Sequence, residues 1–114
     1  MDWQVEFYVD NRRNSPVRDF VGAQNPAARA AILRVINMLR EYGIALRPPY
    51  VKKITKTGLW ELRIHHSSDY YRIFYFAFTG RRFVLLHAFL KKTDKIPKGD
   101  IEIALERMSQ YKNQ

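Results

Sequence analysis

Cysteine is absent from this 114-residue sequence, and glycine is scarce, with five residues. Without cysteine the chain can form no disulfide, no thiolate metal site and no cysteine nucleophile, so thiol redox chemistry is excluded. The glycines occur singly at expected turns, and there is no P-loop, GxGxxG turn or GxSxG elbow. We therefore predict that the protein uses no nucleotide cofactor.

Long apolar runs are also absent. No window approaches the roughly 18 uninterrupted apolar residues of a membrane span. Residues 1–10 lack the charged start and the apolar run of a signal peptide. We expect a cytoplasmic protein with no membrane partner.

Histidine is limited to His65, His66 and His87. His65 and His66 are adjacent, so in a strand they point to opposite faces and cannot chelate one ion together. No HxH, HxxxH or carboxylate spacing accompanies the histidines, and we predict no metal site. His87 lies among apolar strand residues, where a neutral, hydrogen-bonded core histidine is more common than a catalytic base.

What the sequence does contain is concentrated positive charge. Residues 47–98 hold twelve Lys and Arg against three Asp and Glu, whereas the rest of the chain holds eight of each. This segment therefore carries the whole formal net charge of +9. Such a surface attracts polyanions, of which nucleic acid is the commonest.

The composition is that of a folded protein, with 46% hydrophobic and 14% aromatic residues and no repeat or low-complexity stretch. The length suits a single domain over residues 1–114.

The first half of the sequence predicts one strand and two helices. Residues 3–9 alternate between apolar and polar in the manner of a strand. Helix-start signals follow at Ser15-Pro16 and Asn25-Pro26, where a capping side chain precedes a proline suited to the first turn. We expect a short helix ending near Gly22 and a longer one ending at Gly43, paired as a hairpin against the sheet.

The second half predicts strands. A short strand over residues 51–54 precedes three runs rich in aromatic and β-branched residues, Leu59–His65, Tyr70–Phe78 and Phe83–Leu90, which turn residues separate. A short C-terminal helix follows Pro97. The predicted fold is a small α+β domain of order β-α-α-β-β-β-α, with a mainly antiparallel twisted sheet packed against the helical hairpin and the last helix.

Strand alternation gathers polar residues on one face. In the first of the three runs Glu61, Arg63 and His65 share a face, because the apolar residues alternate onto the other. The second run is apolar on both faces, which indicates a central strand. A charged residue such as Arg72 is uncommon there unless it has a partner or reaches a cleft.

These residues also have structural interpretations, which the pattern leaves open. Arg63 could be solvated or could bridge to Glu61, and Arg72 could pair with Glu61 or Asp69. Lys91-Lys92 could be charges that keep a hydrophobic strand from aggregating.

Three motifs and their spacing are recognisable together. They are Gly58–Ile64 (GLWELRI), Tyr71–Tyr75 (YRIFY) and Leu85–Thr93 (LLHAFLKKT), with Pro97 after them. Through them the chain resembles the RelE/HigB toxin superfamily, specifically its phage-derived HigB-like branch, over nearly its whole length in element order.

The resemblance implies a RelE-like fold and the toxin of a bacterial type II toxin–antitoxin module. Such toxins are cytosolic, bind the ribosomal A site and cut the messenger RNA there without metal, which inhibits translation. The implied partners are the ribosome and mRNA, a cognate antitoxin of the small helix-turn-helix kind, and operator DNA only through that antitoxin.

Metal-free RNA cleavage through the ribose 2′-OH needs a base, cations for the phosphorane-like charge and an acid for the leaving 5′-oxygen. Arg63 and Arg72 match the family's positions for phosphate contacts, which suit the guanidinium fork. Lys91-Lys92 lies where relatives carry basic residues, and a lysine there could clamp the phosphate or, if desolvated, act as the acid. Further RNA contacts are expected from the other basic residues of the segment, Lys52, Lys53, Lys56, Arg81, Arg82, Lys95 and Lys98.

The general base stays open. Glu61 stands where RelE-type enzymes place a lysine, and the final helix has no tyrosine where those enzymes place a catalytic one, since Tyr111 lies well downstream. His65 is favoured because it shares the presumed face of Arg63. The candidates by chemistry are Glu61, His65, His66 and His87.

Two other functions remain as alternatives. Basic strands with Tyr and Phe also suit a non-catalytic RNA-binding module on which single-stranded bases stack. A toxin-like scaffold kept as a DNA co-repressor or phage accessory protein is the other. Replacing Arg72 or Arg63 by Ala would weaken a binder in a graded, salt-dependent way but would stop cleavage by an enzyme outright.

Overall fold

A five-stranded sheet organises the computed structural model, which describes residues 3–114. The strands lie in the order β1-β5-β4-β3-β2, and only the β1–β5 pair is parallel. Their bounds are β1 (Gln4–Phe7), β2 (Val51–Lys53), β3 (Trp60–His66), β4 (Asp69–Phe78) and β5 (Arg82–Lys91).

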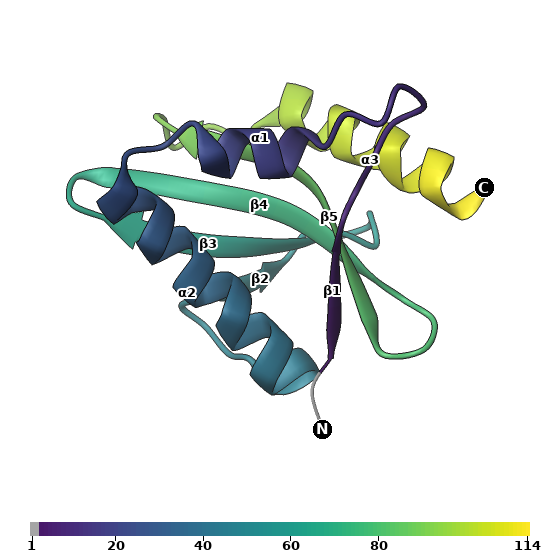
Figure 1. Cartoon of the computed structure of the whole chain (residues 1–114), viewed down its shortest axis with the longest axis horizontal. Coiled ribbons are helices and arrows are strands. Elements are labelled where there is room, and N and C mark those ends of the chain that lie inside the picture. Colours follow the sequence, from purple (N-terminus) through teal and green to yellow (C-terminus); the bar gives the residue numbers. More distant parts are fainter. Residues whose placement is uncertain (1–2) are drawn as a thin grey trace.

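Helices cover both faces of the sheet. Helices α1 (Pro16–Gly22) and α2 (Pro26–Tyr42) pack on one face, mainly against β5 and β3 respectively, and a 3-10 turn, Gly43–Ala45, follows α2. Helix α3 (Lys98–Lys112) packs on the other face, against β4 and β5 (Figure 1). The predicted α+β fold and element order are confirmed, with the short strand expected over residues 51–54 present as the edge strand β2.

Two apolar cores result, one on each face. The larger core joins α1 and α2 to the sheet and includes the fully buried Ile32, Ile36 and Leu39 of α2. The smaller core lies under α3 and includes Phe74 and Leu86. Alternation in the strands therefore serves both cores, as expected for a central strand that is apolar on both faces.

The helix signals of the sequence are met in part. The Asn25 side chain accepts a hydrogen bond from the Ala28 N–H at 2.8 Å and caps α2. The prediction for Ser15 is wrong, because its hydroxyl makes no capping bond and the start of α1 depends on the following proline.

Gly43 ends α2 as predicted, and the structure gives a second reason for it. Its φ is +56°, and a Cβ built there would lie 1.9 Å from the indole nitrogen of Trp3. The backbone N–H of Trp3 also donates to the Arg40 carbonyl at 2.8 Å, so the end of α2 is fixed against the start of β1.

One irregularity interrupts the β4–β5 pairing. Phe74 lies opposite His87 whereas Tyr75 lies opposite Leu85, so Leu86 is the extra residue of a β-bulge. The carbonyl of Leu86 accepts a hydrogen bond from Nη1 of Arg107 at 2.9 Å, which ties α3 to the bulge.

Candidate functional site

An open cleft of about 390 Å³ lies beside the start of α3, on the same face of the sheet. Its floor includes Glu61 and Arg63 of β3 and Phe74 of β4, and its rim includes β2 and the segment that joins β5 to α3. The basic residues that line it are Lys52, Lys53, Arg63, Lys91 and Lys95.

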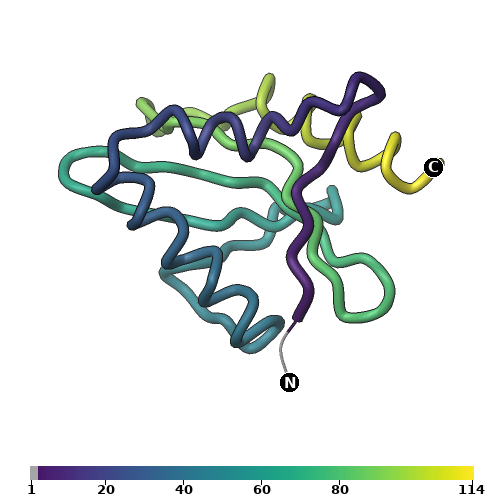
Figure 2. Tube along the Cα trace, viewed as in Figure 1, coloured from purple at the N-terminus to yellow at the C-terminus, as the bar shows by residue number. Residues whose placement is uncertain are grey.

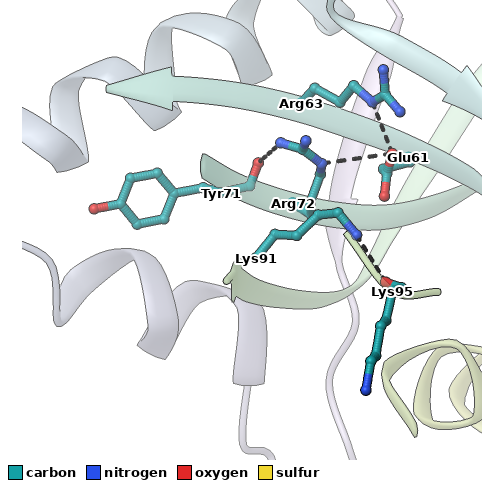
Figure 3. A network of polar contacts seen from close by, with 6 residues as sticks. All are labelled: Glu61, Arg63, Tyr71, Arg72, Lys91 and Lys95. Carbon is teal, nitrogen blue, oxygen red and sulfur yellow. Dashed lines mark hydrogen bonds and ion pairs between the residues drawn. The ribbon is translucent and has the colours of Figure 1, made fainter. Parts of the chain in front are cut away.

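Glu61 and two arginines form a polar network at the edge of this cleft. Arg63 and Arg72 lie directly opposite each other on β3 and β4. Nε of Arg63 donates to Oε1 of Glu61 at 2.8 Å, and Nε of Arg72 lies 3.7 Å from the same oxygen (Figure 3). The sequence-based ion pair of Arg72 with Glu61 is therefore present, and it coexists with the cleft.

The three charged side chains of this network differ in how far they are exposed, and positive charge exceeds negative charge. Glu61 is 5% exposed and is the only charged residue buried among residues 3–114, whereas the Arg63 side chain is 34% exposed and that of Arg72 12%. Burial lowers the pKa of the Arg72 guanidinium, Glu61 opposes that shift, and the charge of Arg63 adds to it. One carboxylate thus faces two guanidinium groups, and a net positive charge is held in a partly desolvated position.

Arg72 is also short of hydrogen bonds. Its Nη1 donates to the Tyr71 carbonyl at 3.2 Å, but its Nε is buried with no hydrogen-bond partner. The Nε atoms of Arg29 and Arg82 are buried without a hydrogen-bond partner as well, so the feature that suits Arg72 to a ligand is its place in the lining of two depressions. The ligand that suits two adjacent guanidinium groups is an anion with several oxygens, such as a phosphate.

Lys91 extends the positive charge along β5. Its Nζ donates to the Lys95 carbonyl at 3.2 Å and so holds the segment after β5 at the cleft (Figure 3). Lys91 and Arg72 also line a neighbouring depression of about 350 Å³, at whose rim Lys92 lies. Lys91 and Lys92 thus share a depression with Arg72, and of the two lysines only Lys91 also lines the cleft.

The three histidines separate in space. His65 is exposed and stacks on Tyr70 beside Arg63 and Arg72, on the face predicted for it. His66 lies at the turn, opposite Asp69. Nε2 of His87 is 2.7 Å from Oδ1 of Asp100 in α3, which fits the hydrogen-bonded structural role that its apolar setting favoured.

Four basic residues predicted as RNA contacts do not line the cleft. Arg82 is at the opposite end of β5 from Lys91. The turn between β3 and β4 and the turn between β4 and β5 lie at these two opposite ends of the sheet (Figure 2). Nε of Arg82 lies 2.9 Å from Oε2 of Glu6, and the Arg81 guanidinium lies over the Trp3 ring. Lys56 and Lys98 are not among the residues that line the cleft, and RNA contacts at all four positions remain predictions.

Sequence reasoning missed three residues that border the arginines, Arg34, Tyr50 and Tyr70, which share a depression of about 370 Å³ with them. Tyr70 could have been found, because the short Ser67-Ser68 turn places it opposite His65 in the register. Arg34 comes from α2, and no local signal connects that helix face to β3.

Within residues 3–114 no group of three or more His, Cys, Asp or Glu side chains is placed to hold a metal ion. In the same range no helix is long and apolar enough to cross a membrane.

The fold and the cleft together define a small basic α+β protein with an open cleft that basic side chains line. A family model described as "Phage derived protein Gp49-like (DUF891)" matches residues 19–109, from α1 to α3. The chain therefore belongs to the phage-derived Gp49-like family, which is of the RelE/HigB-like toxin–antitoxin type. No curated protein matches the chain.

Proposed function

We propose that the protein is the toxin of a type II toxin–antitoxin module and acts as a HigB-like, ribosome-dependent mRNA endonuclease. The observation that carries the proposal is the pair Arg63 and Arg72, held by one buried carboxylate at the edge of an open basic cleft. Membership of a family of the toxin–antitoxin type supports the same conclusion. The protein acts in the cytoplasm on mRNA bound to the ribosome.

Arg63 and Arg72 would bind the scissile phosphate. As the ribose 2′-OH attacks, negative charge grows on the phosphate oxygens, and guanidinium groups fixed beforehand stabilise that charge without reorganising. The network fixes both side chains, since each contacts Glu61. An exposed pair of arginines would lack this preorganisation.

The remaining roles follow from position. Lys91 lines the cleft and is suited to clamp the phosphate or to donate a proton to the leaving 5′-oxygen, and Lys92 lines the neighbouring depression with it. Glu61 is engaged by both arginines, so it serves as their positioning residue more readily than as a base. His65 is the histidine nearest to them along the strand and is the proposed base.

Neutralisation would follow from covering this surface. An antitoxin that places acidic side chains over the cleft, or that displaces α3 from the neighbouring core, would block access to Arg63 and Arg72. DNA would be bound by the antitoxin, and the toxin would reach operator DNA only through it.

The test is primer extension on a defined mRNA in a reconstituted bacterial translation reaction, with and without ribosomes. We expect cuts at codon positions only when ribosomes are present, and loss of those cuts with Arg72→Ala. Arg40→Ala, which removes an arginine of α2 outside the cleft, is the matched control and should cut like the wild type. RNA binding with no cuts in either reaction would favour the non-catalytic binding module instead.

A further inference from the structure

Two aromatic rings lie stacked on the surface next to the arginine network. His65 and Tyr70 face each other across the β3–β4 hairpin, with ring centroids 4.4 Å apart and an angle of 3° between the planes. Both residues are exposed, Tyr70 by 46%. Neither ring belongs to one of the two apolar cores, so core packing does not account for the pair.

Cationic groups flank these rings on both sides. The guanidinium carbon of Arg72 lies 5.8 Å from the centre of the Tyr70 ring. On one side Tyr70 lines the depression that contains Arg34 and Arg63, and on the other it lines the depression that contains Lys91 and Lys92.

The free edge of β3 makes this surface accessible. β2 pairs with β3 from Trp60 to Leu62, and the Arg63 N–H donates to the Tyr50 carbonyl at 2.7 Å. Within residues 3–114 no strand pairs with this edge of β3 from Ile64 to His66. His65 lies two strand residues from Arg63, or about 6.6 Å along the strand. That distance is on the scale of one nucleotide step, so a chain with its phosphate at Arg63 could place the neighbouring base at His65 and Tyr70.

We propose that the His65–Tyr70 pair is a stacking platform for one base of single-stranded RNA, next to the phosphate that Arg63 and Arg72 hold. The proposal rests on the proposed function in taking RNA as the ligand of this surface. Flat aromatic rings accept any base, whereas the flanking cations bind the sugar–phosphate chain, and this combination is how single strands are bound without strong sequence preference.

Stacking and phosphate binding differ in their response to salt, and the experiment uses that difference. The probe is a fluorescently labelled hexanucleotide of adenosine. Six further hexanucleotides each carry an abasic site, at a different position in each. Binding to the full-length protein is followed by anisotropy at several salt concentrations. The variants are Tyr70→Ala and Tyr70→Phe, with Tyr42→Ala as the control, because Tyr42 is a comparably exposed tyrosine, at 51%, at the end of α2.

We expect Tyr70→Ala to weaken binding roughly ten-fold at every salt concentration and to leave the dependence of log Kd on log salt unchanged. Tyr70→Phe keeps the ring and should bind like the wild type, as should Tyr42→Ala. On the one oligomer that lacks the stacked base, wild type and Tyr70→Ala should bind equally.

Four results would overturn the proposal. They are wild-type affinity in Tyr70→Ala, a loss of the same size on all the base-lacking oligomers, no binding by the wild type, and an equal loss of affinity for a hexaglutamate peptide. The last result would assign the surface to an acidic protein partner. The outcome is separable from the proposed function, since ribosome-dependent cutting without this signature rejects only the platform, and the signature without cutting rejects only the enzyme.

Discussion

The face of the sheet that carries α3 has two ends, and they treat their charges differently. At the covered end each cation meets a partner from another element: Arg82 contacts Glu6 and Tyr111, and Arg107 of α3 bonds the Leu86 carbonyl. At the open end, beyond the start of α3, the opposed Arg63 and Arg72 share the single carboxylate of Glu61. The arginines of the covered end thus each have polar partners of their own, whereas those of the open end share one carboxylate.

This difference indicates where the fold gives up stability for function. Two arginines directly opposite each other with one buried carboxylate between them are not an arrangement that packing alone favours. Local violations of this kind concentrate at binding and catalytic sites. The predictions below compare matched substitutions at the two ends.

The largest effect on stability is expected from Glu61→Gln. The change removes the buried negative charge and leaves Arg63 and Arg72 facing each other, so the free energy of unfolding should fall by about 2–3 kcal/mol. Glu6→Gln is the matched change at the covered end, where the carboxylate is an exposed partner of Arg82, and should cost less than about 1 kcal/mol. Urea denaturation measures both, and equal losses would remove the distinction between the ends.

A smaller difference in stability is expected between matched substitutions of Arg107, at the covered end, and Arg72, at the open end. Arg107→Met leaves the bulge carbonyl of Leu86 without its donor and should lower stability by about 1–2 kcal/mol while cleavage continues. Arg72→Met removes a desolvated charge with an unsatisfied Nε, so it should fold as stably as the wild type or more so, yet lose cleavage. Chemical denaturation and the ribosome assay on the same samples test this reversal, and a loss of stability in Arg72→Met would contradict it.

Much of the open end could be predicted from the sequence, because it is built by neighbouring strands. A period of two places Glu61, Arg63 and His65 on one face, and a short turn then brings Arg72 opposite Arg63. The covered end could not be predicted in this way. By sequence Arg82 belongs to the same basic segment as Arg72, and only the packing of α3, whose Tyr111 lies 29 residues further along, assigns it a different environment.

The bulge at Leu86 could not be predicted from the sequence either. Nothing in the apolar run Phe83–Leu90 marks one residue as extra, since alternation carries little information where a strand is apolar on both faces. The same holds for Arg34, which reaches the site from α2 through the way that helix lies across the sheet. Residues contributed by tertiary contacts of separate elements thus form the part of the site that local pattern leaves undetermined.

The smallest expected effect concerns alkaline pH and the covered end alone. Burial raises the pKa of the Tyr111 hydroxyl, and its hydrogen bond to Glu6 raises it further, although the bond from Arg82 opposes the shift. The folded state therefore holds this proton more tightly than the unfolded chain, whose tyrosines titrate at about pH 10. The stabilisation is complete below that pH and is lost as the pH rises through the folded-state pKa.

Tyr111→Phe should accordingly lose less stability than the wild type between about pH 9 and pH 11, as followed by urea midpoints. Phe78→Leu, which removes a ring packed on Tyr111 and keeps the hydroxyl, should be less stable but retain the wild-type pH dependence. An unchanged pH dependence in Tyr111→Phe would show that this hydroxyl does not link α3 to the alkaline stability of the sheet.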